Sequence, residues 1–217
     1  MSDWTLHWLE ASGDLAPWRD TIAFEVEEAR CRVARIVSPP PLDILVRRAP
    51  GQVIPEFGIA GYAPDAHRVF LSVDPDNPNF ADTLRGGALQ RQVAHEVHHC
   101  LRWAGPGYGT TLGEALVSEG LAGQFASRLF GSPPEPWERA VTPAVAAMHF
   151  PSAADLASST YDHSAWFFGV GGKYPRSLGY TLGYLIAGAW LCCVPDVDGE
   201  TFVNVPAEEV LSSWART

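Results

Sequence analysis

The sequence contains little from which a disulfide framework or a nucleic-acid interface could be built. Only four cysteines occur among 217 residues, at positions 31, 100, 192 and 193, and neither their spacing nor the adjacent pair suggests a disulfide framework or a C-x-x-C metal site. Lys and Arg number 15 against 25 Asp and Glu, which gives a net charge of −10. A protein that follows a nucleic-acid backbone carries the opposite sign. We therefore expect no nucleic-acid partner, and the cytoplasm as a reducing compartment.

Membrane and export signals are also scarce. The first residues, Met-Ser-Asp-Trp-Thr, lack the basic and apolar regions of a secretory signal. The segment 177–195 has 19 residues without a charge, near the length of a membrane span, but it contains three glycines, two tyrosines, a serine and a threonine. We interpret it as a buried helix in which Gly179 and Gly183 allow close helix packing, and we expect no membrane association.

The composition is that of a globular protein, with 47% hydrophobic and 18% charged residues. A chain of this length can bury one sizeable core, so a single domain over residues 1–217 is the simplest organisation. We expect an α+β fold, with a small N-terminal sheet and helices over 1–78 and a mainly helical portion over 79–217.

Periodicity and turn residues locate the expected elements. In the first portion they predict a helix over 17–37 and strands over 42–47, 57–62 and 67–73. We expect strand 67–73 to form a sheet edge beside a cleft, where an extended peptide can pair. In the second portion they predict helices over 137–148, 177–193 and 207–215, an irregular aromatic segment over 151–176 and a hairpin over 194–205.

Chemistry concentrates in the segment His95-Glu-Val-His-His99. Helical positions advance by about 100° per residue, so His95 and His99 lie within about 40° of each other. Two such imidazoles and a carboxylate from a neighbouring helix can hold one zinc ion, and Glu96 can act as general base on water. His98 is a less regular ligand, and we interpret it as a residue that supports the ligands or faces solvent.

A helix around these histidines is favoured by its flanking residues. Asn79 or Asp82 can cap its start. An apolar stripe at i, i+4 spacing, opposite the histidines, predicts packing on a core; its members are Leu89, Val93, Val97 and Leu101. Gly105-Pro106-Gly107 ends the helix. Without these signals, two histidines at this spacing are equally compatible with a plain surface helix.

Two carboxylates compete for the third ligand position. Thr111-Leu-Gly-Glu114 fits a capping box, so Glu114 already has a structural role. Glu119 lies among small and apolar residues, where a charge is costly unless it is paired or metal-bound. We favour Glu119, and Gly120 and Gly123 would let its helix approach a neighbour closely.

The chain resembles a known family at these positions. The strings His95-Glu-Val-His-His-Cys-Leu-Arg102 and Glu114-Ala-Leu-Val-Ser-Glu-Gly-Leu-Ala122, with Gly179-Tyr-Thr-Leu-Gly-Tyr184, resemble a family of predicted zinc-dependent proteases. H-E-x-x-H followed after 19 residues by Glu is similar to the gluzincin pattern of thermolysin-like metallopeptidases. The resemblance covers about residues 65–195. It implies a gluzincin-like fold, with His95, His99 and Glu119 as zinc ligands and Glu96 as base.

One position departs from that pattern. Thermolysin-like enzymes have an aspartate four residues after the ligand glutamate, where it supports a histidine. Here the position is Gly123, so another group or a backbone carbonyl must orient the imidazole.

The expected reaction is hydrolysis of a peptide or protein substrate with one zinc ion per chain. Glu96 would take the proton of the attacking water and pass it to the leaving amine. Tyr180, His163 and Tyr174 are candidate donors to the oxyanion. Two alternatives stay open: a zinc hydrolase of a small non-peptide amide, and a non-catalytic protein in which a fourth ligand such as His98 or His163 closes the metal site.

Overall fold

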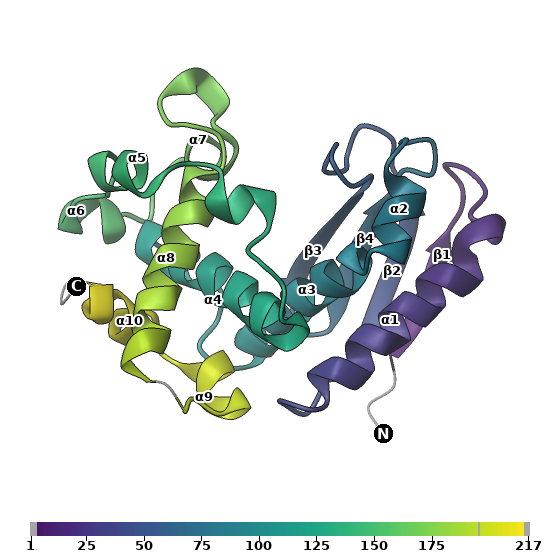
Figure 1. Cartoon of the computed structure of the whole chain (residues 1–217), viewed down its shortest axis with the longest axis horizontal. Coiled ribbons are helices and arrows are strands. Elements are labelled where there is room, and N and C mark those ends of the chain that lie inside the picture. The colour runs from purple at the N-terminus through teal and green to yellow at the C-terminus, as the bar shows by residue number, and fades with distance from the viewer. Residues whose placement is uncertain (1–3, 195, 215–217) are drawn as a thin grey trace. The chain divides into compact units, whose positions relative to one another are not determined.

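The structure is a computed structural model that describes residues 4–194 and 196–214. The chain divides into two compact units, residues 1–104 and 105–217. All described strands belong to the first unit, and the second is helical (Figure 1). This composition confirms the α+β class with a small N-terminal sheet. That the chain forms one domain stays a prediction.

The described strands of the first unit form one sheet in the order β1-β2-β4-β3. Their bounds are β1 Trp4–Leu9, β2 Leu42–Arg48, β3 Ile59–Asp65 and β4 Arg68–Val73. β1 pairs with β2 and β2 with β4 in parallel, whereas β3 pairs with β4 in antiparallel. The strands predicted over 42–47, 57–62 and 67–73 are therefore present with shifted ends. β1 was not predicted; its six residues alternate between half-buried and exposed positions.

The edge assignment from the sequence was wrong. Strand β4 (predicted as 67–73) lies inside the sheet between β2 and β3, and β3 forms the edge. Between the pairs Tyr62↔Phe70 and Asp65↔Arg68, two residues of β3 face one residue of β4, which is a β-bulge. The bulge contains Pro64, a residue that edge strands and bulges tolerate because it lacks an N–H. Which strand is outermost depends on pairing order, which strand propensity does not contain.

Helices cover one face of this sheet. Figure 1 shows α1 (Arg19–Val33) and α3 (Ala88–Ala104) lying across the same face, and the two helices pack on each other. Alternate side chains of β2 form the buried layer below them, and they are Leu42, Ile44 and Val46. The short elements η1 (Ala16–Trp18) and α2 (Phe80–Arg85) precede the two helices. The helix predicted over 17–37 is thus present but shorter.

Helix α3 carries the histidine segment. Leu89, Val93 and Val97 of the predicted stripe are completely buried, and Leu101 is half-buried. The helix ends at Ala104, directly before the predicted terminator at Gly105. Its start differs from the prediction, because Asn79 lies at the N-cap of the separate helix α2. Gly86 and Gly87 interrupt the helix, with Gly87 at a φ of +70°.

The second unit is built around α4 (Leu112–Phe130) and α8 (Leu178–Cys193), which confirms the buried helix predicted over 177–193. Its other elements are η2 (Pro136–Arg139), α5 (Pro143–Met148), α6 (Ala153–Leu156), α7 (His163–Phe168), η3 (Val170–Gly172), α9 (Gly199–Asn204) and α10 (Ala207–Trp214). The helix predicted over 137–148 is therefore two pieces, and segment 151–176 is partly helical.

The hairpin predicted over 194–205 was wrong. Residues 199–204 form helix α9, and the Asp198 carboxylate accepts a hydrogen bond of 2.7 Å from the Thr201 amide at its start. Asp-Gly followed by a short apolar run is compatible with a turn or with an N-cap, and here the carboxylate caps a helix. In the described residues, no helix has both the length and the apolar composition that a membrane crossing requires.

Glycines allow α4 and α8 to cross in close contact. A Cβ atom at Gly120 would lie 2.0 Å from the carbonyl oxygen of Gly183, and one at Gly183 would lie 2.3 Å from that of Leu116. In both cases the nearest atoms belong to the backbone of the opposite helix, which cannot move aside for a side chain as a flexible group could. The close approach that Gly120 and Gly183 were predicted to allow therefore exists, and α8 is the helix that Gly120 meets.

We expect Gly120→Ala to lower the free energy of unfolding by about 1–3 kcal/mol, because an added methyl group would overlap backbone atoms of α8. Urea unfolding of parent and variant measures this. The matched control is Gly188→Ala, whose Cβ would approach only the flexible amide of Gln124. Alanine is the better helix former by about 1 kcal/mol, so the control should not be destabilised. Equal stability of parent and Gly120→Ala would contradict the close crossing.

Candidate functional site

Helix α3 places two imidazoles side by side. His95 and His99 are one turn apart on α3, and their Nε2 atoms face each other at 3.1 Å. The ring centroids are 4.8 Å apart, and the ring planes are inclined at 80°. Both side chains are buried. The helical spacing therefore directs one nitrogen of each ring to the same point.

This arrangement fits a shared zinc ion. Two nitrogens bound to tetrahedral zinc at about 2.0–2.1 Å from the ion stand about 3.3 Å apart, close to the separation of the two Nε2 atoms. Neutral imidazole nitrogen is also among the common zinc donors. The two histidines can thus supply half of a tetrahedral shell without moving.

Glu96 occupies a different side of α3. The residue is 4% exposed, and Oε1 accepts a hydrogen bond of 2.7 Å from the side-chain amide of Gln92, one turn earlier. Across from it lies Gly61 of the edge strand β3, where a Cβ atom would lie 2.5 Å from both Cγ and Oε1 of Glu96. The carboxylate is therefore held between its own helix and the backbone of β3, and only glycine at position 61 leaves it room.

His98 is completely buried, so the alternative that it faces solvent was wrong. Its ring centroid lies 6.4 Å from that of His99, with the ring planes inclined at 68°. The imidazole pair with facing Nε2 atoms is His95 and His99, not His98 and His99.

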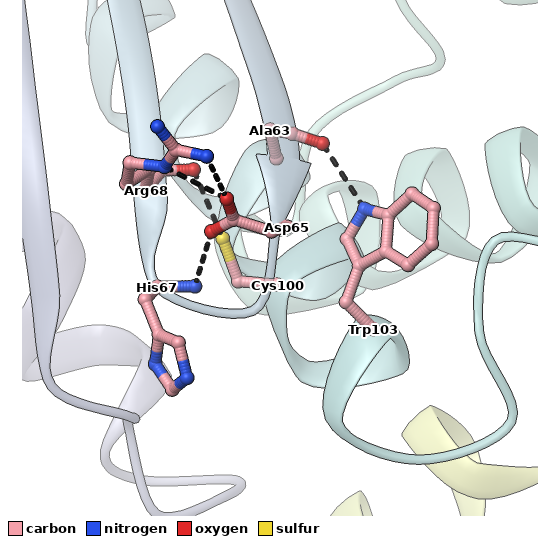
Figure 2. A network of polar contacts seen from close by, with 6 residues as sticks. All are labelled: Ala63, Asp65, His67, Arg68, Cys100 and Trp103. Atoms are coloured by element: carbon pink, nitrogen blue, oxygen red, sulfur yellow. Dashed lines mark hydrogen bonds and ion pairs between the residues drawn. The ribbon is translucent and has the colours of Figure 1, made fainter.

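The second half of α3 is attached to the β3–β4 hairpin. Figure 2 shows the contacts: Trp103 Nε1 donates to the Ala63 carbonyl at 3.1 Å, and Cys100 Sγ donates to the Arg68 carbonyl at 3.6 Å. The Asp65 carboxylate closes the hairpin by accepting from Arg68 Nε at 2.7 Å and from the His67 amide at 2.9 Å. Ala63 belongs to the bulge, and its carbonyl accepts the hydrogen bond from the helix. These contacts hold β3 in position along α3.

Cys100 has no reactive role at this place. Burial, followed by the charges of the nearby Glu96 and Asp65 carboxylates, raises the pKa of its thiol to about 12. The thiol therefore stays protonated at neutral pH and acts as a small packing group with one weak hydrogen bond.

In the second unit, the two candidate carboxylates of helix α4 have different hydrogen-bond partners. Glu114 Oε2 accepts hydrogen bonds from the amides of Thr110 and Thr111, at 2.8 and 2.9 Å, in the predicted capping box. These bonds lower the pKa of Glu114. Glu119 is half-buried, and its Oε1 accepts a hydrogen bond of 2.7 Å from the Tyr108 hydroxyl. Glu114 is thus committed to the helix start, whereas Glu119 is held by a phenol.

Tyr108 is a site residue that the sequence did not reveal. Burial, followed by the charge of Glu119 and the hydrogen bond to it, raises the pKa of Tyr108 far above its usual range. The phenol is therefore neutral and remains a donor. Its only sequence signal is its position as an aromatic residue between two glycines in the turn before α4. Glycines in such a turn indicate the end of the preceding helix rather than a functional residue.

His163 and Tyr161 lie in the electrostatic range of Glu119. Burial lowers the pKa of His163, and the charges of Glu119 and Asp162 partly oppose this. The Tyr161 hydroxyl contacts His163 Nδ1 at 3.3 Å. Burial, with a contribution from Glu119, raises the pKa of Tyr161. Glu119 and these two side chains therefore share one region of the second unit.

The remaining predicted donors are divided between two aromatic clusters. Phe167 stacks on His163, with centroids 4.3 Å apart, and meets Tyr180 edge-on at 5.0 Å. Tyr174 instead stacks on Trp166 at 4.0 Å. His163 and Tyr180 thus border the same phenylalanine, and Tyr174 belongs to the other cluster.

A buried carboxylate lies where the sequence departs from the thermolysin pattern. A Cβ atom at Gly123 would lie 2.1 Å from Oε1 of Glu138, a residue of η2 that is 4% exposed. The other oxygen, Oε2, accepts a hydrogen bond of 2.7 Å from the Glu135 amide. The space that a side chain at position 123 would fill is therefore occupied by the Glu138 carboxylate, which comes from a different element.

A family model described as a predicted Zn-dependent protease matches residues 23–212. No curated protein and no solved structure matches the chain.

Proposed function

Because the chain belongs to the family of predicted zinc-dependent proteases, we propose that it hydrolyses peptide bonds with one zinc ion held by His95, His99 and Glu119. Each of these residues offers one ligand atom, and a group of this composition can hold a metal ion. The observation that carries the proposal is the pair of facing Nε2 atoms on α3, together with the buried Glu96 on another side of the same helix.

Zinc suits this donor set of two imidazoles and one carboxylate, which is that of the gluzincins we take the chain to resemble. When bound by three protein ligands, zinc supplies Lewis acidity to a carbonyl group and lowers the pKa of water. The residues of the chain have the remaining roles. They hold the ligands in place, orient the substrate and transfer the proton.

Glu96 acts as the general base in this proposal. It accepts a proton from the attacking water and returns it to the amine that leaves. The Gln92 amide and the backbone at Gly61 limit the directions in which its carboxylate can point. This preorganisation reduces the entropy cost of reaching the reactive geometry.

The outer edge of β3 is the proposed place for the substrate. The Gly58 carbonyl accepts from the Asp74 amide, beyond the end of β4, whereas the Ile59 carbonyl accepts from the Ile54 amide on the other side. Since strand residues alternate in direction, Gly61 directs its N–H and C=O to the same outer side as Ile59. An extended peptide that pairs with Gly61 would add a strand to the sheet next to Glu96.

Two supporting roles complete the proposal. Tyr180 and His163 remain our candidates for the donor to the developing oxyanion, and the lowered pKa of His163 keeps it a neutral donor at pH 7. Glu138 is our candidate for the group that orients a ligand imidazole, since its carboxylate takes the space at Gly123.

We also propose the cytoplasm as the compartment. All four cysteines are free thiols, the state that a reducing compartment maintains.

Replacing the base tests the reaction itself. We expect Glu96→Gln to lower kcat/KM on a panel of peptides by about 10²–10⁴-fold, because a neutral amide cannot take the proton. Zinc content, measured by elemental analysis after purification without chelator, should stay near one ion per chain. A variant as active as the parent would refute the assignment of Glu96. A parent that cleaves small amides and no peptide would favour a zinc hydrolase of non-peptide amides.

Replacing the third ligand tests the metal site. Glu119→Ala should lose zinc during dialysis against a weak chelator, because two imidazoles alone bind the ion less tightly. Glu114→Ala is the matched control on the same helix, and it should keep zinc while losing about 1 kcal/mol of stability with the capping box. The reverse pattern would make Glu114 the ligand.

The edge strand is tested at Gly61. We expect Gly61→Ala to lower peptide hydrolysis by roughly 10²-fold with zinc retained, because its Cβ would push the Glu96 carboxylate out of place. The matched control, Ala60→Ser, alters the neighbouring residue, whose side chain points to the opposite face, and should leave hydrolysis near the parent's rate. Full activity of Gly61→Ala would show that Glu96 does not work in this position.

A further inference from the structure

The hydrogen bond from Tyr108 to Glu119 stands out among the contacts of the second unit. The phenol donates to Oε1 of the carboxylate at 2.7 Å, across eleven residues of chain. A half-buried carboxylate that must bind a metal can turn about its side-chain bonds and present either oxygen or both. A fixed donor on one oxygen removes that freedom.

The turn that carries Tyr108 is itself tightly held. Gly107 and Gly109 adopt φ values of +87° and +95°, a region that favours glycine. A Cβ atom at Gly109 would lie 2.2 Å from Cβ of Glu114, the capping-box residue. The Ser118 hydroxyl donates to the Tyr108 carbonyl at 2.8 Å. Contacts with α4 therefore fix the turn. This turn places the Tyr108 hydroxyl against the Glu119 carboxylate of the same helix.

We propose that Tyr108 is a positioning residue for the zinc site, occupying Oε1 of Glu119 so that Oε2 alone binds the ion. This inference rests on the proposed function, in which Glu119 is a ligand. A carboxylate that binds through one oxygen takes one position of a tetrahedral shell, which leaves the fourth position for water or substrate. Without the phenol, the carboxylate can bind through both oxygens and occupy that position.

The test is Tyr108→Phe, which removes a single oxygen atom from the full-length chain. Zinc affinity is measured without substrate, by competition with a chromophoric chelator, and should fall about 10–100-fold, the usual cost of losing a partner of a ligand. The matched control is Tyr184→Phe, which removes another phenol hydrogen bond to α4, the one to Ser127 Oγ at 3.2 Å. The control should keep the affinity of the parent.

A second readout distinguishes positioning from a general loss of structure. Cobalt(II) in place of zinc reports its coordination number through its visible absorption. Tyr108→Phe should shift the spectrum from a four-coordinate to a five-coordinate form, whereas Tyr184→Phe should not. Ser118→Ala, which frees the Tyr108 carbonyl, should move affinity and spectrum in the same direction by less.

Two results would overturn the inference. One is unchanged zinc affinity and cobalt spectrum in Tyr108→Phe. The other is lost peptide hydrolysis with unchanged affinity, which would mean that the phenol acts on the substrate. A parent that binds zinc but cleaves no peptide would refute the proposed hydrolysis alone, because affinity and spectrum are measured without turnover.

Discussion

The spacing of one helical turn between His95 and His99 is the constraint on which the rest depends. The buried face of α3 holds their Nε2 atoms facing each other at 3.1 Å. The helix is held in place by its buried stripe and by the contacts of Cys100 and Trp103 with the β3–β4 hairpin (Figure 2). Packing of the first unit is thus what orients the candidate ligands.

The second unit uses the same principle with glycine. The crossing of α4 and α8 depends on the bare backbone at Gly120 and Gly183, so α4 has little freedom to rotate or slide. Its capping box, the turn at Tyr108 and the phenol on Glu119 follow from that fixed helix start. The carboxylate is therefore supported by a rigid element, as a metal ligand requires.

Much of this could be read from the sequence, and the failures have clear causes. Local signals located three helices, because each signal depends on residues close together in the chain: an apolar stripe for α3, a capping box for α4 and an uncharged segment for α8. Strand β4 was placed at the edge, and α9 was read as a hairpin. The edge position depends on the pairing order of distant strands, whereas Asp198-Gly199 is compatible with a hairpin turn or with a helix N-cap. The bulge at Ala63 and Pro64 also has no strong signal until the pairing with β4 is known.

By itself, the sequence determined the chemistry available: the helical His95, Glu96 and His99, the capping box that occupies Glu114, and Glu119 among small and apolar residues. Periodicity and capping are local, so a few neighbouring residues suffice to specify them. Only the tertiary structure decided that Gly61 of β3 lies against Glu96, that Tyr108 holds Glu119, and that Glu138 fills the space at Gly123. Each of these contacts joins separate elements, and their distances depend on how whole helices and strands pack.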